Sequence, residues 1–341
     1  MQVLSATQAI SPAVERTRAL LFRPFEWETF IKLCAVAVLT EGASGNFNTH
    51  SGGSSQPHVY SGPAITHFNP MIVPALVVIA LVVIAIAVVI SYLVVRLRFA
   101  LFDCLVNQTR LIAPGWHKYR DQAFRFFLLS IAIGFVFVAA MVVTVLPFIK
   151  GFWHLYRQGQ LGGEQFPNME ALGIILQLVP IFLAFVLAAV CVDVVMRDFM
   201  LPHYALENAS AGQAWTAMYE RFSREPGAFL LYALLRLILP FVAIVALTIA
   251  LIIPGIIVFG GLGLMMAGLH AAAANGSGPI ADFFMAILGL VILALALLVT
   301  ICVGGPLSIS IRNYALVFYG GRYQALGDIL SPPKVAGTAT A

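Results

Sequence analysis

Two ionisable residues lie inside long apolar segments, where charge is rare and often functional. Asp193 lies about one helical turn from the end of one segment, and Arg236 lies about two turns from the end of another. If both ends face the same side, the two depths differ by only a few ångströms at about 1.5 Å per residue. We expect Asp193 and Arg236 to pair, because each supplies the opposite charge that hydrocarbon lacks. Such a pair either braces a helix bundle or lines a polar path.

A candidate nucleophile, Ser44, lies in Gly42-Ala43-Ser44-Gly45, which is similar to the short motif of rhomboid intramembrane proteases. That chemistry needs a histidine base beside the serine inside a bundle, whereas Ser44 opens a loop, residues 42–69, rich in Gly, Ser and Asn. The zinc motif His-Glu-x-x-His and the phosphate-binding Gly-Lys loop are absent from the sequence. We therefore expect no enzyme, no metal and no cofactor. The loop also holds three histidines at spacings that specify no metal site: His50, His58 and His67.

The composition is that of a membrane protein. Of the 341 residues, 61% are hydrophobic and 10% are charged, against about 45–50% and about 25% in soluble domains. So few charges cannot cover the surface of a soluble protein of this size. We expect lipid to be the solvent of the long apolar segments, and the fold to be an all-α polytopic transmembrane bundle.

The apolar residues predict six spans, since about 20 such residues cross the hydrocarbon layer. The first is the shortest and contains Lys32. The block 228–274 is too long for one span, so we expect Pro254 and the glycines after it to break the helix and leave 255–274 re-entrant or interfacial. The predicted spans are 27–40, 71–95, 123–149, 171–196, 228–253 and 283–311.

The distribution of Lys and Arg predicts the topology. Basic residues cluster in the N-terminal segment, in the second and fourth connections and in the C-terminal segment, and the opposite side has only Lys150 and Arg157. Because basic residues mark the cytoplasmic face, we expect a multi-pass protein of the cytoplasmic membrane with both termini cytoplasmic.

Three spans end in the same way. Arg98, Arg197 and Arg312 are each followed within two residues by an aromatic residue and then by leucine. We interpret the chain as one integral membrane domain, 1–340, with flexible tails at 1–10 and 331–341. Within it we expect three parallel repeats, each an amphipathic helix followed by a two-span hairpin. The repeat units cover about 11–103, 104–202 and 203–320.

Two of the predicted amphipathic helices carry aromatic residues suited to the headgroup boundary. One has Trp116 and Tyr119, and the other has Trp215 and Tyr219. The nearby arginines and lysines suit anionic headgroups. We expect the partners to be membrane lipids at the cytoplasmic face, with no nucleic acid.

The segments 11–16 (Ser-Pro-Ala-Val-Glu-Arg) and 21–25 (Leu-Phe-Arg-Pro-Phe), with the arginine span ends, resemble a group of uncharacterised bacterial six-span proteins. The group includes the membrane domain attached to some glycerophosphodiester phosphodiesterases and the YciC-like proteins. The resemblance implies a cytoplasmic-membrane protein and carries over no catalytic residue. The sequence favours a non-enzymatic scaffold or lipid-surface regulator, and the alternative is a transporter or channel-like protein for a small solute or lipid.

Overall fold

The computed structural model describes residues 3–41, 72–157, 169–274 and 278–331. All regular elements within these ranges are helices, as the sequence predicted. The predicted loop with Ser44 and the three histidines lies outside the described residues. The chain forms two compact units, one of residues 1–119 with 221–341 and the other of residues 120–220, and each is described by itself. The single domain and the threefold repeat stay predictions.

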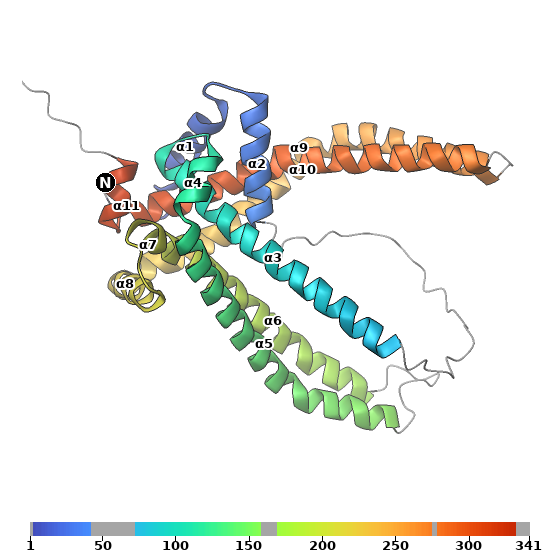
Figure 1. The fold of residues 1–341 in the computed structure, drawn as a ribbon, viewed down its shortest axis with the longest axis horizontal. Helices are drawn as coiled ribbons and strands as arrows, with labels where there is room; N and C mark the ends of the chain where they lie inside the picture. Colours follow the sequence, from blue (N-terminus) through green and yellow to red (C-terminus); the bar gives the residue numbers. More distant parts are fainter. Residues whose placement is uncertain (1–2, 42–71, 158–168, 275–277, 332–341) are drawn as a thin grey trace, which may run out of the picture. The chain divides into compact units, whose positions relative to one another are not determined.

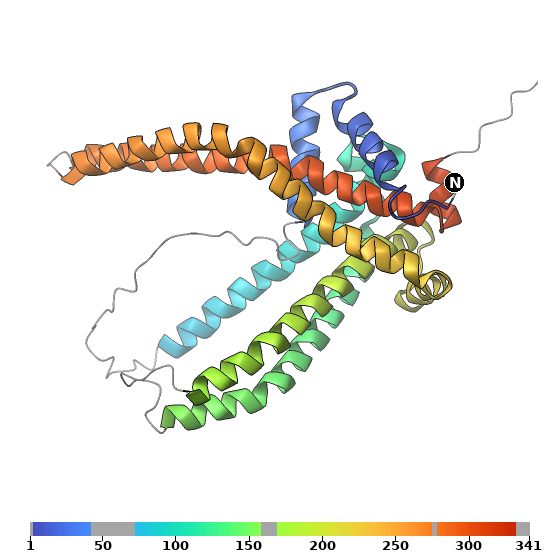
Figure 2. The ribbon, with the colours of Figure 1, turned by 180° about the vertical axis from the view of Figure 1, so that it is seen from behind.

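The first unit is built around a long helical hairpin. Figures 1 and 2 show α9 and α10 side by side along their length. Tyr232 of α9 stacks on Tyr314 of α10 with ring centroids 5.2 Å apart, and towards the other end Met266 lies against Gly289. The elements of this unit are α1 (Ile10–Phe22), α2 (Trp27–Glu41), α3 (Ile72–Asn107), α4 (Ile112–Lys118), α9 (Pro226–Ala274), α10 (Gly278–Gly320) and α11 (Gln324–Leu330).

The core of the first unit lies at the ends of its long helices. Residues 312–320 of α10 and 99–106 of α3 are all buried, and α1, α2, α4 and α11 pack against these ends. By contrast, α3 is exposed on every side over residues 76–91. Burial of aromatic and aliphatic side chains therefore holds the helix ends together, and the apolar stretches are left for lipid or another protein to cover.

Small residues allow two close helix crossings in this unit. A Cβ built on Gly305 of α10 would lie 2.6 Å from Cα of Cys34 in α2. A Cβ built on Gly115 of α4 would lie 3.0 Å from Cα of Ala100 in α3. A residue without a side chain lets backbones approach to this distance, so these glycines fix where α2 and α4 cross their partners.

The second unit is a helical hairpin followed by shorter helices. α5 and α6 pack side by side, and residues 196–204 after them are buried. Phe126 of α5 meets Tyr204 edge-on, with ring centroids 5.4 Å apart. The elements are α5 (Arg120–Arg157), α6 (Met169–Val194), the π-helix η2 (Val195–Met200), α7 (Leu201–Leu206) and α8 (Ala211–Arg224), of which residues up to Glu220 belong to this unit.

The described residues contain five helices long and apolar enough to cross a membrane, rather than the six predicted. The first predicted span corresponds to α2, which has 15 residues and a length of about 22 Å, short of the hydrocarbon thickness of about 30 Å. In addition, the end of α2 contacts Arg98 and Arg312, residues that the prediction placed on the opposite side of the membrane. The five helices are Leu76–Asn107, Arg120–Gly151, Leu172–Leu206, Pro226–Ala273 and Pro279–Gly320.

The predicted helix break after residue 253 was wrong. α9 continues without interruption through Pro254 and the glycines at 255, 260, 261 and 263 to Ala274, a helix of 49 residues and about 74 Å. A proline removes one backbone hydrogen bond, and long apolar helices tolerate this loss when the neighbouring backbone groups remain bonded. Residues 255–274 therefore extend α9 and are not a separate re-entrant segment.

Candidate functional site

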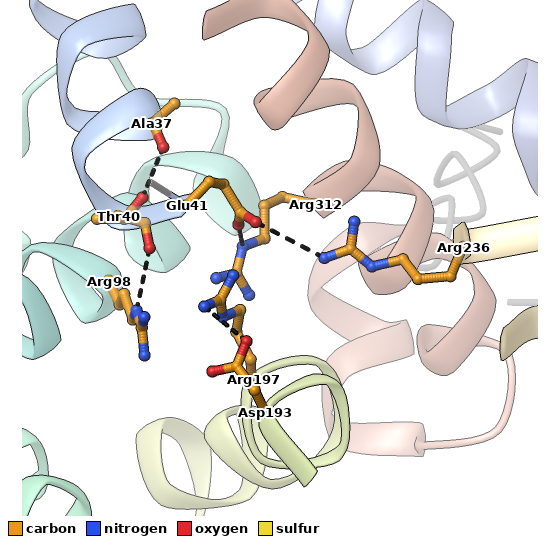
Figure 3. Close-up of polar contacts among 8 residues, drawn as sticks. All are labelled: Ala37, Thr40, Glu41, Arg98, Asp193, Arg197, Arg236 and Arg312. Carbon is orange, nitrogen blue, oxygen red and sulfur yellow. Dashed lines mark hydrogen bonds and ion pairs between the residues drawn. The ribbon is translucent and has the colours of Figure 1, made fainter. Parts of the chain in front are cut away.

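A carboxylate and two guanidinium groups form a cluster at the C-terminal end of α2 (Figure 3). Glu41 Oε1 accepts a hydrogen bond from Arg312 Nε at 2.6 Å, and Glu41 Oε2 lies 3.8 Å from Arg236 Nη2. The two arginine side chains are each 10% exposed and the glutamate side chain is 20% exposed. Charges removed from water in this way are kept only when they are paired. The cluster joins α2, α9 and α10 through one carboxylate and two guanidinium groups.

The same helix end is held by a third arginine. Arg98 Nε of α3 donates to the carbonyl oxygen of Thr40 at 3.3 Å, and Thr40 Oγ1 donates to the carbonyl oxygen of Ala37 at 3.0 Å. The last carbonyls of a helix have no partner within it and carry its partial negative charge. A guanidinium is therefore a favourable partner for the end of α2.

Other arginines of the first unit also donate to helix-end carbonyls. Arg110 Nε donates to the carbonyl of Leu20 near the end of α1 at 2.9 Å. Arg16 Nη2 donates to the carbonyl of Leu105 near the end of α3 at 3.0 Å. Because guanidinium donors are fixed in a planar fork, each of these bonds sets the position of one helix end against another element. We call these contacts the arginine ties.

A further tie ends α4. Arg96 Nη2 donates to the carbonyl of Trp116 at 3.0 Å, and its guanidinium lies 4.1 Å from the centre of the Trp116 ring. Arg96, one of the basic residues predicted at the cytoplasmic face, therefore makes these contacts within the protein.

Residues 4–329 match a family of unknown function. The chain belongs to the DUF7544 family. The match begins before α1 and ends within α11, so the arginine cluster, the whole second unit and nearly all of the first lie inside the matched region. No curated protein and no solved structure matches the chain. The resemblance to the membrane domain of glycerophosphodiester phosphodiesterases and to YciC-like proteins is not shown by these comparisons.

The two predicted partners each have a contact within their own unit of the DUF7544 chain. Asp193 Oδ2 lies 2.7 Å from Arg197 Nη2, one turn along the same helical stretch, and Arg236 faces Glu41. A direct Asp193–Arg236 pair stays a prediction. Glu41 is absent from the residues predicted from the sequence, although it is the only acidic residue between Glu28 and Asp103 and stands at the end of an apolar segment.

The three span ends share their surroundings. After Arg98, Arg197 and Arg312, the aromatic residue and the leucine of the predicted motif are buried in each case. Each arginine also has a polar partner in its own unit: the carbonyl of Thr40, the carboxylate of Asp193 and the carboxylate of Glu41. The aromatic residues and leucines are Phe99, Leu101, Phe199, Leu201, Tyr314 and Leu316.

The four predicted interfacial aromatic residues differ in exposure. Tyr119 is buried and donates from Oη to Asp103 Oδ1 at 3.0 Å, and burial raises the pKa of its hydroxyl, which stays protonated as this donor requires. Trp116 is partly covered by Arg96. In contrast, Trp215 and Tyr219 of α8 are 53% and 57% exposed. Of these four residues, only the two in α8 are mostly exposed.

Proposed function

We propose that this protein is a non-enzymatic membrane scaffold that contacts anionic lipid headgroups along its cytoplasmic face. One observation carries the proposal: helix α8 leaves three aromatic side chains exposed, Trp215, Tyr219 and Phe222. Their spacing of four and three residues places them along one side of the helix. The residues directly before Trp215 and Tyr219 are buried, namely Ala214 and Met218. The rest of the protein therefore covers only part of the apolar side of α8.

The headgroup boundary suits such a helix. Tryptophan and tyrosine have a broad apolar ring and one polar group, and they concentrate where hydrocarbon meets water. The exposed Arg224 at the end of α8 supplies the positive charge that attracts anionic lipid. We infer that α8 lies in the interface plane with its aromatic side facing the lipid.

The arginine ties support the scaffold. They join the ends of α1, α2, α3 and α4 to other elements through charge-assisted hydrogen bonds. Helix ends joined in this way, with apolar helices exposed to lipid, suit a protein that presents a fixed surface to the headgroups. It requires no substrate and no reacting group.

The proposal includes the predicted topology, with both termini cytoplasmic. Arg16 of α1 donates to the carbonyl of Leu330 in α11 at 3.3 Å, and Thr17 of α1 accepts from Asn313 of α10 at 2.9 Å. These contacts support termini on one side of the membrane.

Lipid-dependent quenching of Trp215 tests the scaffold. The full-length protein is reconstituted into bilayers with phosphatidylglycerol brominated near the carbonyl end of its chains, and fluorescence is compared with the Trp215→Phe variant to isolate the Trp215 signal. We expect bromine to quench this signal strongly and aqueous iodide to quench it weakly. Strong iodide quenching without bromine quenching would place α8 in water and overturn the proposal.

A transporter is the second candidate, favoured by the nearly buried charges of Arg236 and Arg312 within two candidate spans. It predicts solute flux in sealed vesicles that is lost on substitution of Glu41.

A further inference from the structure

An apolar groove lies within the second unit, between α5, the end of α6, the π-helix η2 and the start of α8. Its volume is about 270 Å³. Leu129 and Ile133 form the α5 wall, Cys191 and Met196 belong to the α6–η2 wall, and Trp215 lines it from α8. None of the lining residues carries a charge, so an occupant must be apolar along the part that enters.

The π-helix η2 supplies part of the groove wall. In a π-helix the backbone hydrogen bonds reach one residue further than in an α-helix, and such segments frequently mark functional sites. Val195, Met196 and Met200 of η2 line the groove, and the flexible thioether side chains of methionine adapt to occupants of varied shape. The opposite wall begins with a small residue, Ala211.

The groove is placed for access from the membrane. Its walls belong to two candidate spans, Arg120–Gly151 and Leu172–Leu206. Its α8 side carries Trp215, which is exposed and on the proposed interfacial side of that helix. In the proposed orientation the groove therefore lies near the cytoplasmic ends of these two helices, next to the headgroup boundary.

A positive charge, Arg125, lies one helical turn before the first groove residue of α5, Leu129. Arg125, Leu129 and Ile133 follow one another at intervals of four residues, so they line the same side of α5. The Arg125 side chain is exposed, and its Nη1 lies 3.5 Å from Asn208 Oδ1 in an exposed contact. An exposed guanidinium one turn from an apolar groove matches a phosphate attached to a hydrocarbon chain.

We propose that the groove binds one acyl chain of an anionic phospholipid and that Arg125 contacts its phosphate. The inference rests on the proposed function, since it names one lipid and its site on a protein that contacts lipid headgroups. The volume is close to the lower end of small-molecule sites, about 300–1,000 Å³, so it suits one chain rather than a whole lipid. The charge of Arg125 and the apolar lining together favour a lipid over a second copy of this chain.

Native mass spectrometry of the full-length protein in mild detergent tests the site. Dioleoyl phosphatidylglycerol and dioleoyl phosphatidylcholine are added in competition, and retained lipid is counted per chain. We expect one phosphatidylglycerol to be retained preferentially. Arg125→Gln should reduce its affinity about tenfold, because a hydrogen bond to a charged group is lost. The control Arg120→Gln removes an exposed arginine at the start of the same helix and should change the affinity little.

A second pair of variants tests the groove itself. Ala211→Phe fills the groove and should abolish retention of both lipids, whereas Thr216→Phe, on the exposed surface of α8, should leave it unchanged. Equal effects of Arg125→Gln and Arg120→Gln, or lipid retention by a folded Ala211→Phe variant, would overturn the proposal. A change of oligomeric state in Ala211→Phe without any lipid in the wild type would assign the groove to a second copy and also overturn it. Melting temperatures identify variants that fail to fold, in which case Met200→Phe replaces Ala211→Phe as the filling variant.

The two proposals fail separately. If lipid retention does not depend on Arg125 or on the groove but Trp215 is still quenched by brominated lipid, the lipid site is refuted and the scaffold proposal stands. If neither signal is found, both proposals fall.

Discussion

The crossing of α2 over α10 gives the sharpest prediction. Gly305→Ala places a Cβ 2.6 Å from Cα of Cys34, whereas carbon atoms in contact lie about 3.5–4.0 Å apart. The obstacle is backbone, so rotation of a side chain cannot relieve it. α2 must therefore move away by about 1 Å.

The cost has two parts. Overpacking costs about 1–3 kcal/mol and is partly offset by about 1 kcal/mol of helix propensity gained when alanine replaces glycine. A shift of about 1 Å also stretches the bond from Arg98 to Thr40, already 3.3 Å, beyond hydrogen-bonding distance. Weakening the contacts of Arg98 and Arg312 adds about 1.5–3 kcal/mol. We expect a net loss of about 3 kcal/mol.

Thermal unfolding of the detergent-solubilised protein measures the loss. At about 2–4 °C per kcal/mol, Gly305→Ala should lower the melting temperature by about 6–12 °C. The neighbouring Gly304→Ala is the matched control, because its Cβ would lie 3.4 Å from Val38 Cγ2, the end of a side chain. It should be neutral or raise the melting temperature. If both variants behave alike, the close crossing of α2 and α10 is not as described.

Three further predictions concern the cluster, a buried hydroxyl and the topology. Glu41→Gln removes the carboxylate charge that Arg236 and Arg312 contact and should cost about 3 kcal/mol in the same assay. Glu28→Gln, in an exposed pair with Lys32, should have little effect, and equal effects would contradict the buried pairing. Tyr119→Phe removes the hydrogen bond to Asp103 and should lower the free energy of unfolding by about 1–2 kcal/mol, and no loss in denaturant titration would show that the bond contributes nothing. Tags at the two termini should both be protected from protease added outside intact cells, and exposure of one alone would refute the proposed sidedness.

The long helices could be predicted from the sequence because their signal is local. The segments 123–149, 228–253 and 283–311 each fall within a single long helix of the structure. The helix ends were placed less well: α3 continues to Asn107, beyond the predicted end at 95, because the residues after Arg96 bury an apolar surface against other elements. A helix that changes from lipid to protein surroundings does not stop at the end of its apolar run.

The polar contacts could not be predicted from the sequence, because they join residues far apart in the chain. Arg16 contacts Leu330 and Arg110 contacts Leu20, and no spacing rule links these positions. Glu41 was overlooked for a related reason: its importance depends on Arg312 lying beside it. The charge pattern showed where arginines gather, and only the packing shows which carbonyl or carboxylate each one reaches.

The arginine ties are chemically one-sided. Every residue type carries a backbone carbonyl, so an exchange of Leu20, Thr40 or Leu105 for another residue of similar size keeps the acceptor in place. The donor has no such latitude, because lysine cannot reproduce a planar guanidinium. The positions that supply the carbonyls should therefore tolerate any substitution that preserves packing. Substitutions of the arginines that donate to them should be the damaging ones.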